Sequence, residues 1–214
     1  ISPILSNIYL HYVLDEWFVK HVQPRLSGRA FMIRFADDFV MGFAEERDAR
    51  RVLEVLPKRV GRYDLRLHPE KTRLLHFVPP ERGDATTSFD FLGFTHRWER
   101  SRKGRWVVRQ STKKASMCKA LAKIWETCRT HRHMSLKEQC QDLNRRLNGH
   151  YQYFGITGNH PNVYRFYRRV RRIWRYWLGK RDRSRAMPWQ RFQQLLRHYP
   201  LAPPWIPHSV YHNS

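Results

Sequence analysis

Two adjacent carboxylates, Asp37 and Asp38, are the residues whose types and spacing point most clearly to chemistry. They lie between two apolar runs of strand length, residues 31–35 and 39–43, so the pattern predicts a β-hairpin with the pair at its tip. Neighbouring side chains of a regular strand point to opposite faces, whereas a tight turn can direct both toward one place. Two such anions favour a bound cation, Mg²⁺ above all, and suit metal-assisted phosphoryl transfer. An Asp-Asp pair is also common in polar turns that bind nothing.

The elements expected around this pair make an α+β fold. A Ser-Pro start followed by apolar residues at helical spacing predicts a helix over residues 2–22, and residues 49–60 predict a second amphipathic helix. Shorter apolar runs predict strands, and a polar stretch predicts a loop. The strands are expected at 65–67, 72–78, 89–94 and 106–108, the loop at 79–88, and further helices at 112–130, 135–150, 162–179 and 187–198.

The basic charge of the chain is concentrated in its second half. The sequence has 41 Lys and Arg against 18 Asp and Glu, and residues 101–214 hold 25 of the basic residues and 4 of the acidic ones. Such a segment suits nucleic acid or an anionic membrane surface. We expect the apolar stripe of the helix at 162–179 to pack in a bundle, which leaves its arginines for phosphate. The basic candidates are Arg102, Lys103, Arg105, Lys113, Lys114, Arg165, Arg168, Arg169, Arg172 and Arg175.

Bulk features exclude several classes of protein. No apolar stretch approaches the roughly 18–20 residues that a membrane span needs, and no secretory signal is recognisable at the N-terminus. The three cysteines, Cys118, Cys128 and Cys140, form no C-x-x-C pair, and their odd number argues against a disulfide framework. We therefore expect a cytoplasmic, reduced protein without zinc, in which each cysteine is a small buried side chain of a helix.

Five segments in order resemble the reverse transcriptases of group II introns, also called intron maturases. Residues 1–10 with Leu14 and Asp15 resemble the palm helix of that family, and residues 35–38 (FADD) resemble its Y-A-D-D hairpin. Residues 67–72 (LHPEKT) are similar to the L-x-x-x-K-T motif, and residues 91–94 (FLGF) to the motif that grips the primer. Residues 143–154 (LNRRLNGHYQYF) resemble the maturase-specific segment of the polymerase thumb.

The resemblance implies a role for each matching residue. Asp37 and Asp38 would bind catalytic Mg²⁺, and Lys71 would lie near the incoming nucleotide and assist the leaving pyrophosphate. Leu92, Gly93 and Phe94 would position the primer end, and Arg145, Arg146 and Asn148 would contact nucleic acid. From the residues alone, Lys71 also fits an ordinary solvated lysine, and Gly93 fits a bulge or close-approach glycine.

The same resemblance implies the domain organisation and the partners. Residues 1–108 would form an incomplete palm, an antiparallel sheet with helices, residues 109–200 an all-helical thumb bundle, and residues 201–214 an extended tail. The partners would be intron RNA, an RNA template and a DNA primer.

One feature of the family is missing from the sequence. No segment resembles the fingers or the palm strand that carries the first catalytic Asp, so we expect a fragment, a degenerate copy or half of a split enzyme. Such a chain would need an N-terminal fingers and palm fragment to polymerise DNA. Two alternatives stay open, a non-catalytic RNA-binding splicing factor and a related CRISPR-associated or diversity-generating reverse transcriptase.

Overall fold

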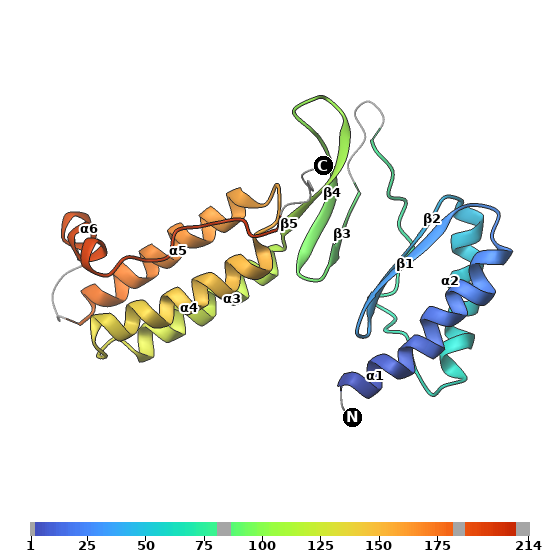
Figure 1. Ribbon diagram of the computed structural model, residues 1–214, viewed down its shortest axis with the longest axis horizontal. Coiled ribbons are helices and arrows are strands. Elements are labelled where there is room, and N and C mark those ends of the chain that lie inside the picture. Colours follow the sequence, from blue (N-terminus) through green and yellow to red (C-terminus); the bar gives the residue numbers. More distant parts are fainter. Residues whose placement is uncertain (1–2, 81–86, 182–186, 209–214) are drawn as a thin grey trace. The chain divides into compact units, whose positions relative to one another are not determined.

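The computed structural model describes residues 3–80, 87–181 and 187–208, and it divides into two compact units, residues 1–87 and 88–214 (Figure 1). Each unit combines helices with an antiparallel sheet, as the predicted α+β class requires. The predicted domain boundary after residue 108 falls inside a strand, β5 (Trp106–Thr112). That strand and its neighbours belong to the same compact unit as the helices that follow.

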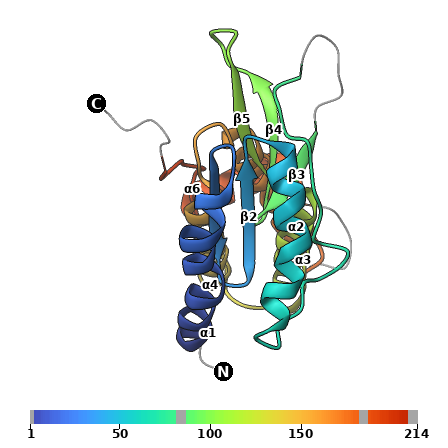
Figure 2. The same ribbon diagram turned by 90° about the vertical axis from the view of Figure 1, so that its right-hand side faces the viewer.

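The first unit is a two-stranded hairpin packed against helices. The described part of this unit starts with α1 (Pro3–Leu10) and continues through the π-helical turns η1 (His11–Asp15) and η2 (Phe18–Val22) and the short 3₁₀-helix η3 (Gln23–Arg25). Strands β1 (Ala30–Phe35) and β2 (Asp38–Phe43) form the predicted hairpin, and α2 (Glu46–Gly61) follows. Figure 2 shows the helices alongside the hairpin. The core consists of Val13, Leu14, Trp17, Phe18, Val22, Val52, Leu56 and Val60.

The strands predicted at 65–67 and 72–78 are wrong, because residues 64–80 form no strand in the part of the chain that the structure describes. Leu65 and Leu67 are half-buried because they pack against the core of the first unit. Their alternation therefore reflects one-sided packing rather than pairing with a neighbouring strand. The amides of Lys71 and Thr72 both donate to the carbonyl of His68 and close a turn instead. Most of the loop predicted at 79–88 lies outside the described residues.

The second unit begins with a three-stranded sheet and continues with four helices among the described residues. The strands β3 (Ser88–Phe91), β4 (Phe94–Arg100) and β5 are adjacent in chain order. The strand predicted at 89–94 is wrong in one respect, because Leu92 and Gly93 form a turn between β3 and β4. The helices are α3 (Lys114–Thr130), α4 (Leu136–Phe154), α5 (His160–Gly179) and α6 (Trp189–His198), within a few residues of the predicted bounds.

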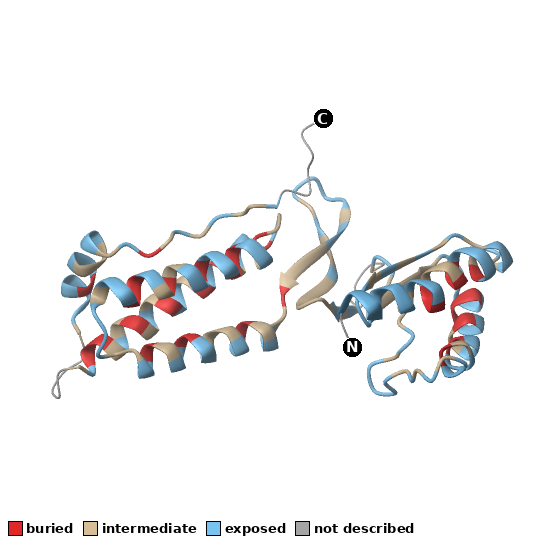
Figure 3. Ribbon diagram, turned by 60° about the horizontal axis from the view of Figure 1, so that its bottom comes forward, coloured by how far each residue is buried: buried red, intermediate tan, exposed pale blue. Residues whose placement is uncertain are grey.

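The helices of the second unit share one core. Figure 3 shows buried positions recurring along one side of each long helix. The most deeply buried members are Leu143, Leu147, Tyr151, Val163, Phe166, Val170, Trp174 and Phe192. Residues 200–208 contain no helix, and they pack along the helices through buried Leu201 and a hydrogen bond of 2.7 Å from the Ala202 amide to Asn144 Oδ1.

The structure tests the expectation that each cysteine is a small buried side chain of a helix. Cys128 and Cys140 are buried in helices as expected, and burial raises the pKa of the Cys128 thiol to about 12. Cys118 is in a helix but exposed, so the expectation that it is buried is wrong.

Among the described residues, no helix combines the length and apolarity that crossing a membrane would require.

Candidate functional site

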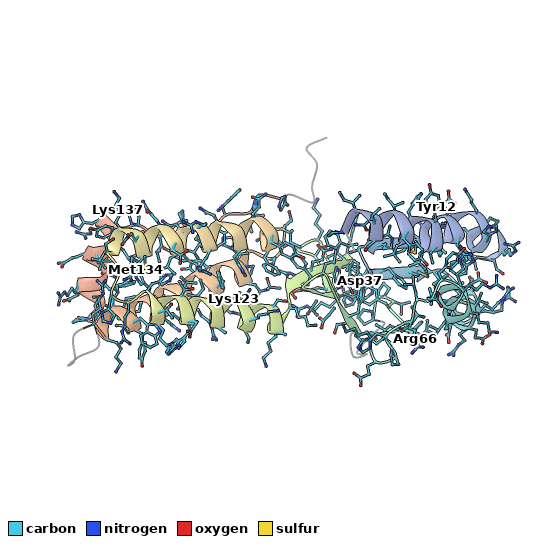
Figure 4. The ribbon with its side chains drawn as sticks, turned by 90° about the horizontal axis from the view of Figure 1, so that it is seen from below. Tyr12, Asp37, Arg66, Lys123, Met134 and Lys137 are labelled. Atoms are coloured by element: carbon cyan, nitrogen blue, oxygen red, sulfur yellow. The ribbon has the colours of Figure 1, made fainter. Side chains whose placement is uncertain are left out.

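The two carboxylates lie at the tip of the β1–β2 hairpin, as their position in the sequence predicts (Figure 4 labels Asp37). Ala36 adopts a positive φ of 53°, which turns the chain within two residues, and Asp38 pairs with Phe35. Both aspartates are exposed, and among the described residues neither side chain has a hydrogen bond or ion pair. The hairpin therefore presents two adjacent carboxylates that form no ion pair with a cation in the described part of the chain.

Arg34 fixes the turn that carries these aspartates. Its guanidinium donates to both carboxylate oxygens of Asp15 at 2.7 Å, which ties β1 to η1. Its remaining nitrogen donates to the carbonyl of Ala36 at 2.9 Å and to Asn7 Oδ1 at 3.0 Å. The hydrogen bonds from Arg34 lower the pKa of Asp15, so this carboxylate is an ion-pair partner rather than a free metal ligand. A charged residue on the inward face of an apolar strand was the signal for this pair, and the sequence interpretation missed it.

The outer face of the hairpin is apolar and uncovered. Phe31, Ile33 and Phe35 alternate along β1 and are 56%, 54% and 66% exposed. Phe31 lies opposite Gly42, and a side chain at Gly42 would overlap its ring. The carboxylate pair thus stands at the end of an exposed aromatic and aliphatic surface, which is unusual for a completed sheet.

The donor set at the hairpin tip fits part of a divalent metal site. Carboxylate oxygens are the ligands that Mg²⁺ prefers, and a complete site needs more ligands than two adjacent residues supply. Within the described ranges, no three His, Cys, Asp or Glu side chains gather where they could hold a metal ion. Lys71 is exposed, and among these residues no hydrogen bond joins its side chain to either aspartate. The structure therefore places Asp37 and Asp38 side by side, and it shows no bond from the Lys71 side chain to either of them in the described ranges.

In the second unit, residues 91–94 form a hairpin turn that is fastened to α4. Leu92 and Gly93 have positive φ values of 48° and 77°, a conformation that glycine adopts without strain. The Tyr153 hydroxyl donates to the Leu92 carbonyl at 3.0 Å, and the rings of Tyr153 and Phe154 pack on Phe94. Two motifs that are distant in the sequence, residues 91–94 and 143–154, therefore meet in space.

A buried asparagine joins the sheet of this unit to its helices. Asn159 is fully buried, and its side chain accepts the Thr112 amide at 3.0 Å and donates to the Thr112 hydroxyl and the Phe154 carbonyl at 2.8 Å each. It thereby connects the end of β5, the end of α4 and the start of α5. The sequence interpretation did not identify Asn159, because an Asn-His-Pro sequence resembles an ordinary helix start.

Helix α5 presents the arginines predicted to bind nucleic acid. Arg165, Arg168, Arg169 and Arg172 are exposed on the side opposite the buried stripe. Arg175 is half-buried, with its guanidinium 4.2 Å from the centre of the Trp189 ring and an N–H donated to the Met187 carbonyl at 3.1 Å. Arg175 therefore packs α6 against α5, whereas the other four guanidinium groups reach solvent.

The acidic residues of the second unit are few and occupied. Those that the structure describes are partnered as follows: Asp90 with Lys113, Glu99 with Arg97 and Arg109, Glu126 with Arg129, Asp142 with Arg145 and Arg146, and Glu138 with the start of α4 through Ser135. Lys113, Arg145 and Arg146 are thus partly neutralised. The remaining predicted contacts, Arg102, Lys103 and Arg105 in the β4–β5 turn, Lys114 on α3 and Asn148 on α4, are exposed.

Comparison with known protein families gives a match over the first part of the chain. Residues 1–96 match the family model for reverse transcriptase (RNA-dependent DNA polymerase). The matched region contains the β1–β2 hairpin with Asp37 and Asp38, Lys71, and the turn at Leu92 and Gly93. The comparison with curated proteins found no match.

Proposed function

We propose that this chain is the palm and thumb portion of a group II intron reverse transcriptase and maturase. The observation that carries the proposal is the pair of carboxylates at a tight hairpin tip, without a partner among the described residues and within a region that matches the reverse transcriptase family model. Asp37 and Asp38 hold Mg²⁺ in this proposal. When bound, the metal stabilises the charge that develops on phosphate oxygens during nucleotide transfer.

The second unit binds nucleic acid in this proposal. Its exposed arginines on α5 form no ion pair with an acidic residue that the structure describes, and each of those acidic side chains has another partner. Arginine forks recognise phosphate and can stack on unpaired bases, so intron RNA and a template–primer duplex are the proposed ligands. The attachment of residues 91–94 to Tyr153 supports a joint role of these two motifs in holding a primer.

The exposed apolar surface of the first unit supports a polypeptide partner. The outer face of β1 and several residues of the N-terminal helices are exposed, namely Phe31, Ile33, Phe35, Ile4, Leu5, Ile8, Tyr9 and Tyr12. Surfaces of this kind mark sites where another protein segment packs. We propose that a fingers and palm polypeptide covers it and supplies the further carboxylate that the metal site needs.

Primer extension tests the catalytic part of the proposal. The chain is combined with a fingers and palm polypeptide from a group II intron reverse transcriptase, and DNA synthesis is measured on an RNA template with Mg²⁺. Asp37→Asn and Asp38→Asn should each abolish extension. Asp64→Asn is the matched control, because Asp64 is exposed in the same unit at a φ of 55° that asparagine tolerates. Extension that persists in Asp37→Asn would contradict the metal-binding role.

A second candidate function is RNA binding without catalysis. It is favoured by the absence of a third metal-binding side chain beside the aspartates in the described ranges. It predicts binding of intron RNA that is tighter than binding of unrelated RNA of equal length and is unchanged in Asp37→Asn. Retained RNA binding without extension under any complementation would favour this candidate over the polymerase.

A further inference from the structure

A groove runs along the surface between α3 and α5. It has a volume of about 480 Å³ and is lined by Leu121, Ala122, Trp125, Arg169, Arg172 and Ile173. Its α3 side is apolar and ends at a tryptophan, and its α5 side carries two arginines. This combination of an apolar floor, an aromatic ring and two cations is the chemistry that recognises a nucleotide.

Trp125 is held in place but not covered. Its ring stacks on Tyr176 with centroids 5.0 Å apart and an interplanar angle of 26°, and the edge of Trp177 lies 5.2 Å away. The residue is still 41% exposed, so the contacts with α5 fix the indole while part of it borders the groove. An exposed tryptophan that its neighbours orient loses little conformational entropy when a base stacks on it.

The two arginines of the groove carry uncompensated charge. Among the described residues, Arg169 and Arg172 have no hydrogen bond or ion pair. The nearest acidic residue in sequence to the tryptophan, Glu126, is occupied by Arg129 through hydrogen bonds of 2.6 and 2.9 Å. The groove therefore offers an anionic ligand two cations that no acidic residue of the described ranges pairs with.

We propose that this groove binds an unpaired nucleotide of single-stranded RNA, with its base on Trp125 and the flanking phosphates at Arg169 and Arg172. The proposal rests on the RNA-binding role proposed above for the second unit, and it specifies one contact point of that role. A base in a duplex is stacked on its neighbours and cannot reach the indole, so the site selects single-stranded over double-stranded segments. Single-stranded DNA offers the same kinds of base and phosphate but has no 2′-hydroxyl. Comparing its affinity with that of single-stranded RNA therefore separates recognition of the 2′-hydroxyl from stacking.

The stacking contact is tested with variants of Trp125 in the full chain. Binding of a twelve-nucleotide unstructured RNA is measured by fluorescence anisotropy, beside an RNA duplex and a single-stranded DNA of equal length. Trp125→Leu should weaken binding of both single strands by about tenfold and duplex binding by less than about twofold, because stacking on an aromatic side chain is lost. Trp125→Phe should keep binding within about threefold, because it retains a ring. Trp205→Leu is the control, since Trp205 is 45% exposed outside the groove.

The phosphate contacts are tested by salt dependence. The double variant Arg169→Gln/Arg172→Gln should lower the slope of log affinity against log salt by about 1.4, at about 0.7 per phosphate on a single strand. Arg191→Gln/Arg197→Gln removes the same charge from exposed positions of α6 and should change the slope less. An equal change of this slope in both double variants would mean that RNA is attracted by the overall positive charge rather than bound at this groove, and it would overturn the proposal.

Cys118 provides an independent readout on the native sequence. It is exposed and lies on α3 one and two turns before Leu121 and Trp125, whereas Cys128 and Cys140 are buried. Bound RNA should slow the reaction of Cys118 with a thiol reagent at least about fivefold, and Trp125→Leu should reduce this protection at equal RNA concentration. Circular dichroism of each variant checks that the fold is intact.

Two failures can be told apart. If the unaltered chain binds no RNA, the proposed function of the second unit fails and the groove with it. If the unaltered chain binds RNA but Trp125→Leu binds single strands as well as Trp205→Leu does, only the nucleotide site is wrong.

Discussion

The carboxylate hairpin of the first unit and helix α5 of the second unit position their charged groups in different ways. On α5 the exposed arginines lie opposite a stripe of residues that are at most 4% exposed: Val163, Phe166, Val170, Trp174 and Leu178. On the hairpin, the turn before Asp37 is held by the single guanidinium of Arg34, and the outer face is open. The groups proposed to bind nucleic acid are therefore separate from those that stabilise the fold on α5, whereas on the hairpin the same few residues would serve both.

The largest expected effect comes from the buried side of α5. Trp174 is fully buried, its indole N–H donates to Gln139 Oε1 at 2.9 Å, and its ring packs edge-on against Phe192. Trp174→Ala should lower the free energy of unfolding of the second unit by about 4 kcal/mol, because it leaves a cavity and an unsatisfied amide. Urea denaturation followed by circular dichroism measures this. The exposed control Trp205→Ala should change it by less than about 0.5 kcal/mol. Equal losses in the two variants would contradict the described core.

The second-largest expected effect is a dependence of the stability of the second unit on pH. His150 is buried and stacks on Phe166 at 3.7 Å between ring centres, and burial lowers its pKa to about 4. In the unfolded chain its pKa is about 6.5, so between these values the unfolded state binds more protons. The stability of the unit should therefore fall as pH decreases from about 6.5 to about 4, by up to about 3 kcal/mol.

Substitution of the histidine isolates this effect. His150→Phe should flatten the dependence of the unfolding free energy on pH in that window, since it keeps an aromatic ring at this position and removes the titratable imidazole. His198→Gln, an exposed position on α6, should leave the dependence as it is. If both variants retain the full slope, another group is responsible for it.

On the hairpin, the ion pair of Arg34 and Asp15 should contribute less to stability than the buried groups of the second unit do. Its loss should also affect the turn that carries the aspartates. The side chain of Arg34 is 11% exposed and that of Asp15 27%. Arg34→Met should lower the unfolding free energy of the first unit by about 2 kcal/mol, because the partly buried Asp15 loses both bonds from Arg34 and keeps only its 3.3 Å contact with His11. The matched variant Arg50→Met breaks an exposed pair with Glu46 and should cost at most about 0.5 kcal/mol.

The same variant also tests whether Arg34 positions the turn. Without its bond to the Ala36 carbonyl, amide hydrogen exchange in residues 35–38 should accelerate relative to the rest of β1 and β2. Because the pKa of Asp15 is lowered in the fold, the contribution of the pair should be present above the unfolded value near 3.8 and disappear as pH falls below it. Unchanged exchange at the turn would mean that Arg34 stabilises the unit without positioning the aspartates.

The sequence predicted what depends on strong local periodicity. The hairpin at 31–43 was predicted from two apolar runs of strand length around a polar centre, and the four later helices from apolar residues at helical spacing. Residues 65–67 and 72–78 alternate as strands do, yet the alternation only tells which side packs on the core. A strand also requires a partner, and that is a property of the tertiary structure.

The parts of the candidate sites that were missed are contacts between distant residues. Arg34 and Asp15, Tyr153 and Leu92, and Asn159 and Thr112 are separated by 19, 61 and 47 positions. No local pattern encodes such a pair, although a polar residue within an apolar segment indicates that some partner exists. The exposed arginines of α5 were predicted as a group, and the structure was needed to separate Arg175 from the rest.

The difference between Arg175 and the exposed arginines of α5 gives the smallest predicted effect. It also tests the contrast between the two faces of this helix most directly. Arg175 stacks on Trp189 and donates to Met187, whereas Arg168 is exposed, with its guanidinium 6.0 Å from the centre of the Tyr164 ring. Arg175→Gln should cost about 1 kcal/mol of stability, since a cation–π contact and a hydrogen bond are lost, and should leave the salt slope of RNA binding unchanged. Arg168→Gln should leave stability within about 0.5 kcal/mol and lower that slope by about 0.7, the value for one phosphate on a single strand. The two variants remove the same charge from one helix, so an equal loss of slope would mean that Arg175 leaves Trp189 to bind phosphate. An equal loss of stability would mean instead that the exposed face of α5 also supports the fold, and the two faces would not be separable.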